Sequence, residues 1–163
     1  MTLGWSAIAI GIALAGSGTL VAIRSVQLTP GFVFFHMEYP RFLLTMLTEM
    51  AMFAALLVAG IVTRKKPTVH RAMMLLAGLA ILPGATSRIP VLYPVFGHSG
   101  WIGLFAPVFC LGALLLLIRI AMAHRVDPWF AGGYAVLVVA YIASTNLSLT
   151  ETWSRIATKI LAL

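Results

Sequence analysis

The stretch VTRKKPTVHRAMMLLAGLAILPGATSRIP, residues Val62–Pro90, places a basic cluster directly between two long apolar runs. Arg64, Lys65, Lys66 and Arg71 form the cluster, and His70 lies within it. An α-helix rises about 1.5 Å per residue, so about 20 apolar residues cross the ~30 Å hydrocarbon core of a bilayer. The stretch therefore predicts a charged turn between two membrane-spanning helices.

The composition of the whole chain indicates the same class of protein. Of the 163 residues, 61% are hydrophobic and 9% are charged, whereas a soluble domain has about 25% charged residues. A globule this small cannot bury so much apolar surface, because a chain of about 150 residues still leaves roughly 30% of its unfolded area exposed. The lipid bilayer is thus the expected partner, and the single Cys110 excludes an internal disulfide.

Five apolar runs are long enough to cross a membrane. We predict an all-α integral membrane helical bundle, a single transmembrane domain over residues 1–163, with spans near 3–23, 42–62, 72–92, 101–122 and 129–149. The remaining C-terminal residues place Trp153, Ile156, Ala157 and Ile160 at helical spacing. They predict a short C-terminal interfacial helix.

Two features predict how the spans pack. Small residues recur on one face of the first span, which lets a neighbouring helix approach closely; they are Gly4, Ala7, Gly11, Ala15, Gly18 and Ala22. In the third span, Pro83 removes a backbone donor and predicts a kink.

The net charge of +7 follows from where lysine and arginine lie. The side of the N-terminus receives Arg64, Lys65, Lys66, Arg71, Arg119 and Arg125, and the opposite side receives Arg24, Arg41, Arg155 and Lys159. The denser side is expected to be cytoplasmic, so the N-terminus is predicted to be cytoplasmic. The basic residues border apolar runs, which favours lipid headgroups as their partner and gives no support to nucleic-acid binding.

Polar groups inside the spans predict a pocket in the half opposite the N-terminus. Glu49 and Arg88 lie in antiparallel spans at similar depth, and we expect them to form an ion pair, because charges within a bilayer usually face the bundle interior. Asn146 occupies the same half, and His36 and His98 lie in the loops above it. Such a pocket either locks the helices in register or binds a small polar ligand, a proton or a lipid headgroup.

The histidines raise an alternative. His70 and His124 lie at the start of the third span and the end of the fourth, and a haem in a helix bundle takes two axial imidazoles from facing helices. Their distribution resembles that of the transmembrane b-type cytochromes of the ascorbate-reducing kind, which would imply haem b, with quinone as an exchange partner. The rival interpretation is that both are juxtamembrane residues beside basic anchors. No catalytic or metal-ligating motif occurs, so an enzymatic activity is not favoured.

The segment RKKPTVHRAMMLLAGLAILPGATSRIP also resembles a signature of a family of uncharacterised bacterial multi-pass inner-membrane proteins. That signature is a basic pair, Pro, two residues, His, a basic residue and then Met-Leu-Leu-Ala. It is matched here by Lys65, Lys66, Pro67, His70, Arg71, Met74, Leu75, Leu76 and Ala77. The segment from Ala123 to Trp153 is similar to the family's last span. The resemblance implies a bacterial inner-membrane location, and implies that this chain lacks the family's first two helices.

These observations predict a non-enzymatic membrane protein. It is expected to be an accessory subunit of a larger assembly, with other subunits or itself as partners, or a binder of a small polar or lipid ligand at the Glu49–Arg88 pocket. The alternatives are a b-type electron-transfer protein that uses His70 and His124, and a transporter that would have to oligomerise.

Overall fold

The computed structural model of the chain describes residues 2–92, 95 and 99–161, without the side chains of residues 2–5, 7 and 90. Five helical spans are long and apolar enough to cross a membrane, as predicted. They are formed by α1 (Thr2–Leu28), α2 (Tyr39–Val62), α3 (Pro67–Ala80) continued by α4 (Leu82–Thr86), α6 (Gly100–Ala123) and α7 (Pro128–Ser148). The prediction of an all-α membrane bundle is confirmed.

The third span differs from its predicted range of 72–92. It begins at Pro67 and ends at Thr86. Proline is favourable in the first turn of a helix, where its missing N–H would have no partner anyway. The basic residues that follow Pro67 therefore belong to the helix. At the other end, a 3-10 turn over Pro90–Leu92 follows the helix.

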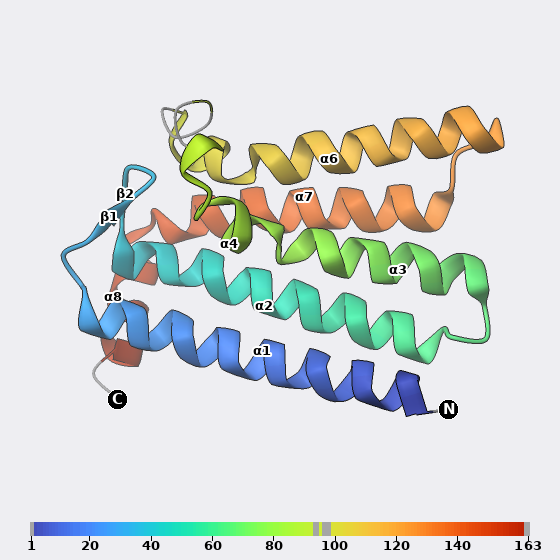
Figure 1. Ribbon diagram of the computed structural model, residues 1–163. Coiled ribbons are helices and arrows are strands. Elements are labelled where there is room, and N and C mark those ends of the chain that lie inside the picture. Colours follow the sequence, from blue (N-terminus) through green and yellow to red (C-terminus); the bar gives the residue numbers. More distant parts are fainter. Residues whose placement is uncertain (1, 93–94, 96–98, 162–163) are drawn as a thin grey trace.

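The spans form a bundle with α2 near its centre (Figure 1). Helix α2 packs against α1, α3 and α7, and α7 in turn packs against α3 and α6. The largest fully buried side chains include Tyr141, Phe105, Phe130 and Leu43. The two turns after α2 and α6 lie with the start of α1 at one end of the bundle, called the N-terminal end here.

Helix α1 is the outermost span. Within its membrane-spanning range 11% of residues are buried, compared with 39% for α2. Its small-residue face contacts α2, as predicted: a Cβ added at Gly11 would strike Leu57, and one at Gly18 would strike Met50. Gly4 and Ala7, which were assigned to the same face, lie outside the described side chains.

The opposite end of the bundle holds a β-hairpin and the last helix, and is called the hairpin end here (Figure 1). Strands β1 (Val33–Phe34) and β2 (Met37–Glu38) pair with a two-residue turn at Phe35 and His36, both at positive φ, as in a type I′ turn. This hairpin lies within a segment whose sequence predicted only a loop.

Helix α8 (Glu151–Leu161) also lies at the hairpin end. It confirms the predicted short C-terminal helix, and it buries Trp153 and Ala157 against Ala22 and Val26 of α1 and Leu43 of α2. Its opposite face is polar, which suits a position at the membrane surface.

Candidate functional site

A break in the third span organises the polar groups of the hairpin end. Helix α3 ends at Ala80, and α4 starts at Leu82 with Pro83 in its first turn. In a continuous helix the Gly84 N–H would donate to the Ala80 carbonyl. Here the Ala80 carbonyl instead accepts a hydrogen bond of 2.5 Å from the Tyr141 hydroxyl of α7. The predicted kink at Pro83 is thus a full interruption of the helix.

The Gly84 N–H that the break releases faces an acidic side chain. Glu49 lies on α2 with 4% of its surface exposed, and its carboxylate accepts a hydrogen bond from the Gly84 backbone. A Cβ at position 84 would lie 3.4 Å from Glu49 Oε2. Glycine therefore leaves just enough room for the carboxylate to reach the backbone of α4.

Arg88 follows α4 and lines the same space as Glu49, but it does not form the predicted direct ion pair. The prediction assumed one continuous helix through Pro83. The break turns α4, so that Gly84 contacts the carboxylate and the Arg88 guanidinium acts on Glu49 through its charge at longer range. The structure brings the two residues into one site and leaves a cavity beside them.

This space consists of two neighbouring cavities, called lobes here. They share a wall formed by Tyr39, Met46, Glu49, Gly84 and Arg88. One lobe, the aromatic lobe, has a volume of about 180 Å³ and is lined by the rings of Phe32, Phe34, Tyr39 and Phe42. The other, the α1 lobe, has a volume of about 390 Å³ and lies between α1, α2 and α4.

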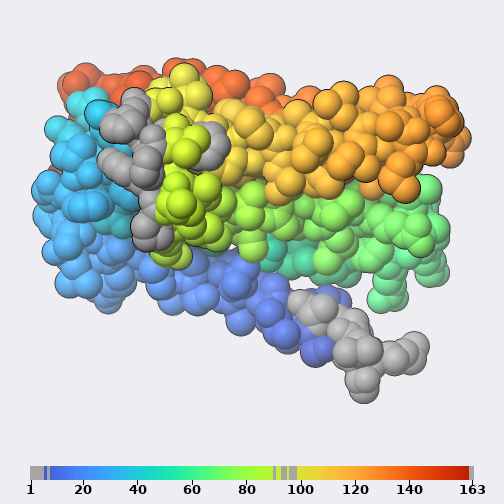
Figure 2. All heavy atoms as spheres, turned by 45° about the horizontal axis from the view of Figure 1, so that its top comes forward, coloured from blue at the N-terminus to red at the C-terminus, as the bar shows by residue number. Residues whose placement is uncertain are grey.

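The α1 lobe opens toward the outer surface of the bundle. Two of the apolar side chains along it, Leu14 and Val21, are 41% and 56% exposed, and the rest of its α1 wall consists of Ser17, Gly18, Ala22 and Ser25. Figure 2 shows the face on which α4 (yellow-green) lies next to α1 (blue). In a bilayer this opening faces the lipid chains, because α1 is apolar over its whole spanning length.

The other residues predicted for the pocket lie elsewhere. Asn146 is exposed on α7 and does not line either lobe, because the inner face of α7 is formed by Tyr141, Ser144, Thr145 and Ser148. His36 is exposed at the tip of the hairpin, away from the lobes that its neighbours line. His98 lies outside the described residues.

The two candidate haem ligands occupy separate structural positions. His70 Nδ1 lies 2.7 Å from the Gly60 carbonyl oxygen in the last turn of α2, where backbone carbonyls lack helical partners. His124 is exposed and ends α6 at φ 50°. Helix α7 packs against both α3 and α6 (Figure 1). Among the described residues, no contact joins the two imidazoles, and no group of three His, Cys, Asp or Glu side chains is placed to hold a metal ion.

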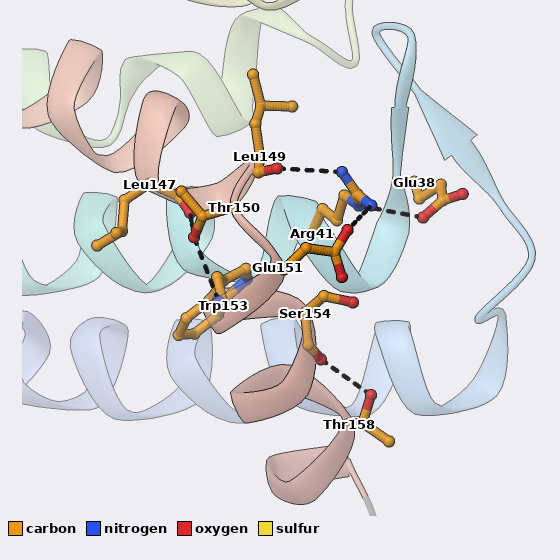
Figure 3. Close-up of polar contacts among 9 residues, drawn as sticks. All are labelled: Glu38, Arg41, Leu147, Leu149, Thr150, Glu151, Trp153, Ser154 and Thr158. Atoms are coloured by element: carbon orange, nitrogen blue, oxygen red, sulfur yellow. Dashed lines mark hydrogen bonds and ion pairs between the residues drawn. The ribbon is translucent and has the colours of Figure 1, made fainter.

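Arg41 has a structural role that was not predicted from the sequence, where it counted only as a topological charge. Figure 3 shows its guanidinium between the hairpin, the end of α7 and the start of α8. Arg41 Nε lies 3.3 Å from Glu38 Oε2, Nη1 donates to the Leu149 carbonyl at 3.3 Å, and Nη2 lies 4.0 Å from Glu151 Oε1. The available signal was the spacing of Glu38 and Arg41, which allows an ion pair across one helical turn.

A second contact that was not predicted, between Asp127 and Arg119, joins α6 and α7 at the N-terminal end. Asp127 caps α7 by accepting hydrogen bonds from the backbone N–H groups of Trp129 and Phe130, and it pairs with Arg119 of α6. Burial raises the pKa of the Asp127 carboxyl, but the hydrogen bonds from Arg119 and the backbone outweigh it, so the net pKa is lowered. The Arg119 guanidinium also lies 5.2 Å from the centre of the Phe130 ring.

Comparison of the chain with protein-family models, with curated proteins and with solved structures finds no match.

Proposed function

We propose that this chain is a non-enzymatic membrane protein that binds a small polar or lipid ligand in the cavity beside Glu49 and Arg88. One observation carries the proposal. A carboxyl group that is 4% exposed lines a cavity of about 390 Å³, which extends along α1 to the apolar surface of the bundle.

The physical reason is the free energy of the buried Glu49 carboxyl; Arg88, by contrast, is exposed. A polar side chain away from water needs hydrogen-bond partners, because burying it without them is costly. In the described structure Glu49 has one backbone N–H and the longer-range charge of Arg88. A polar ligand in the cavity would complete the partners of both groups, and an apolar ligand tail would fill the α1 lobe.

Native mass spectrometry of the detergent-purified protein, loaded with a total bacterial lipid extract, tests the proposal. Ser17→Phe fills the α1 lobe at an exposed position whose hydroxyl bonds only to its own helix. Val139→Phe, on an exposed position of α7, adds a ring away from the cavity. The proposal predicts a retained lipid or small molecule in the wild type and in Val139→Phe, and its loss in Ser17→Phe. Equal retention by all three would refute it.

An accessory subunit is the second candidate, and the exposure of α1 favours it. With 11% of its spanning residues buried, α1 presents large apolar side chains outward, among them Ile10, Ile12 and Leu20. Membrane helices with little burial in their own chain are available to pack against another subunit or a second copy. Purification after cross-linking in cells would show a fixed partner, and a monomeric product alone would contradict this candidate.

The location and orientation are proposed on charge. We place the chain in a bacterial inner membrane with a cytoplasmic N-terminus, because the loop with Arg64, Lys65 and Lys66 lies at the N-terminal end and lysine and arginine concentrate on the cytoplasmic side. The resemblance of residues 64–90 to the family of bacterial multi-pass proteins supports the same location. Reporter fusions at residues 65 and 126 should be active only as cytoplasmic reporters; periplasmic activity at both would reverse the orientation.

A further inference from the structure

The chain has four acidic residues, and they differ in whether an arginine lies close enough to form an ion pair with them. Glu38 and Glu151 lie beside Arg41, and Asp127 pairs with Arg119. Glu49 is the most buried of the four, and in the described part of the chain neither it nor Arg88 has a direct ion-pair partner. One carboxyl group and one guanidinium group thus border the same space without bonding to each other directly.

This arrangement restricts the charge of a suitable ligand. A purely anionic headgroup would pair with Arg88 and offer the Glu49 carboxyl no donor. A purely cationic headgroup would donate to Glu49 and leave Arg88 without an acceptor. A headgroup with both signs can satisfy both residues, and charge-assisted hydrogen bonds to an arginine and a carboxylate are the stronger class of hydrogen bond.

The aromatic lobe indicates which end of the headgroup it receives. Its four rings are in mutual contact: Phe32 and Tyr39 have centroids 5.5 Å apart, and Phe34 and Phe42 have centroids 5.1 Å apart. Aromatic faces attract ammonium groups, most strongly away from water. Glu49 and Arg88 line this lobe as well, so rings, a carboxyl group and a guanidinium group border one space of about 180 Å³, and an ammonium group on the Glu49 side would be the partner of the carboxyl. An ammonium group fits that environment.

The α1 lobe indicates the rest of the ligand. It shares Glu49 and Arg88 with the aromatic lobe as lining residues, and it continues past Leu14 and Val21, which are exposed on the lipid-facing surface of α1. Hydrocarbon chains are the material that surrounds this opening in a bilayer. A molecule held at the charged wall can therefore extend its apolar part along α1.

We infer that the ligand is a phospholipid whose headgroup carries both an ammonium and a phosphate group, as in phosphatidylethanolamine. The ammonium enters the aromatic lobe beside Glu49, the phosphate contacts Arg88, and an acyl chain lies in the α1 lobe. This inference rests on the ligand-binding function proposed above and adds the chemical class of the ligand.

The test compares three diacyl lipids with identical chains, bound to delipidated protein and measured by native mass spectrometry. They are phosphatidylethanolamine, phosphatidylglycerol, which has the phosphate without an ammonium group, and a diacyl trimethylammonium-propane, which has an ammonium without a phosphate. The wild type should retain phosphatidylethanolamine about tenfold more strongly than either of the others, a difference of about 1.4 kcal/mol. The wild-type comparison decides the question even if a variant fails to fold.

Two charge variants then assign the groups. Glu49→Gln should abolish the preference over phosphatidylglycerol, and Arg88→Gln should abolish the preference over the cationic lipid. Glu151→Gln and Arg155→Gln, both at exposed positions of α8, are the matched controls and should retain both preferences.

The failures are distinguishable. Equal retention of the three lipids by the wild type, reduced together in Ser17→Phe, would overturn the headgroup inference and leave ligand binding standing. Retention of every lipid at the level of Ser17→Phe would overturn both.

Discussion

The break between α3 and α4 predicts that Tyr141→Phe is more damaging than a hydroxyl deletion elsewhere in the bundle. Tyr141 is fully buried, stacks on Phe105 at 4.5 Å, and donates to the Ala80 carbonyl. No backbone donor reaches that carbonyl in the described part of the chain. Removing the hydroxyl therefore leaves a buried acceptor without a partner.

Tyr134→Phe is the matched control. Its hydroxyl donates to the Phe109 carbonyl at 2.6 Å, but Phe109 lies inside the continuous helix α6. The N–H of Ala113, which also contacts the Tyr134 hydroxyl, is therefore in place to serve that carbonyl once the hydroxyl is removed. Interhelical hydrogen bonds in membrane proteins average about 0.6 kcal/mol and reach about 1.7 kcal/mol. We assign the average to Tyr134 and the upper value to Tyr141.

Thermal unfolding in detergent measures the difference. For a chain of this size each kcal/mol shifts Tm by about 2–4 °C. Tyr141→Phe should thus lower Tm by about 3–7 °C, and Tyr134→Phe by about 1–2 °C. If Tyr134→Phe lowered Tm as much as Tyr141→Phe, the Ala80 carbonyl would not be the group that sets the cost, and the reasoning from the helix break would fail.

Three further predictions follow from other contacts. Gly18→Leu should loosen the packing of α1 on α2 and increase the rate at which a protease cleaves α1, because Gly18 faces Met50. Gly16→Leu should leave that rate unchanged, since nothing lies within 4 Å of a Cβ there; equal cleavage rates in the two variants would contradict the assigned face. Asp127→Asn should lower the free energy of unfolding by less than about 1 kcal/mol. The wild type has this stability above the ordinary carboxyl pKa near 4 and loses it as the pH falls through the lowered pKa of Asp127; acid unfolding curves that coincide for both proteins would contradict this. The absorption spectrum of protein from haem-supplied cells should lack a Soret band. His70 Nδ1 is within hydrogen-bond distance of the Gly60 carbonyl, and no contact joins the His70 and His124 rings in the described structure. Reduced α and β bands that are lost in His70→Ala would restore the haem alternative.

The length and apolarity of the runs were sufficient to predict the spans, since both are set by the thickness of the bilayer. The partners inside the bundle were harder to predict. Periodicity assumes an unbroken helix, so the sequence placed Arg88 opposite Glu49, whereas the interruption before Pro83 brings Gly84 to that carboxylate. Short-range spacing shows whether a proline can interrupt a helix, but the direction of the following segment depends on packing against other helices.

The orientation of α7 illustrates a signal that was present and not used. Ser144, Thr145 and Asn146 are consecutive, and polarity alone does not separate them. Leu137 and Tyr141 precede Thr145 at intervals of four, and this row is the buried face, which leaves Asn146 exposed on α7. The hairpin contacts of Arg41 depended on tertiary packing of three separate segments and had no comparable signal beyond its spacing from Glu38.

The most direct test of the central claim is photo-crosslinking in membranes with a phosphatidylethanolamine that carries a diazirine in its acyl chain, followed by peptide mapping. The account predicts that labelling concentrates on α1 around Leu14–Val21 and on α2 around Met46–Met50, and that Ser17→Phe removes this excess while labelling of the exposed face of α7 stays constant. Uniform labelling of α1, α6 and α7, unchanged in Ser17→Phe, would contradict it.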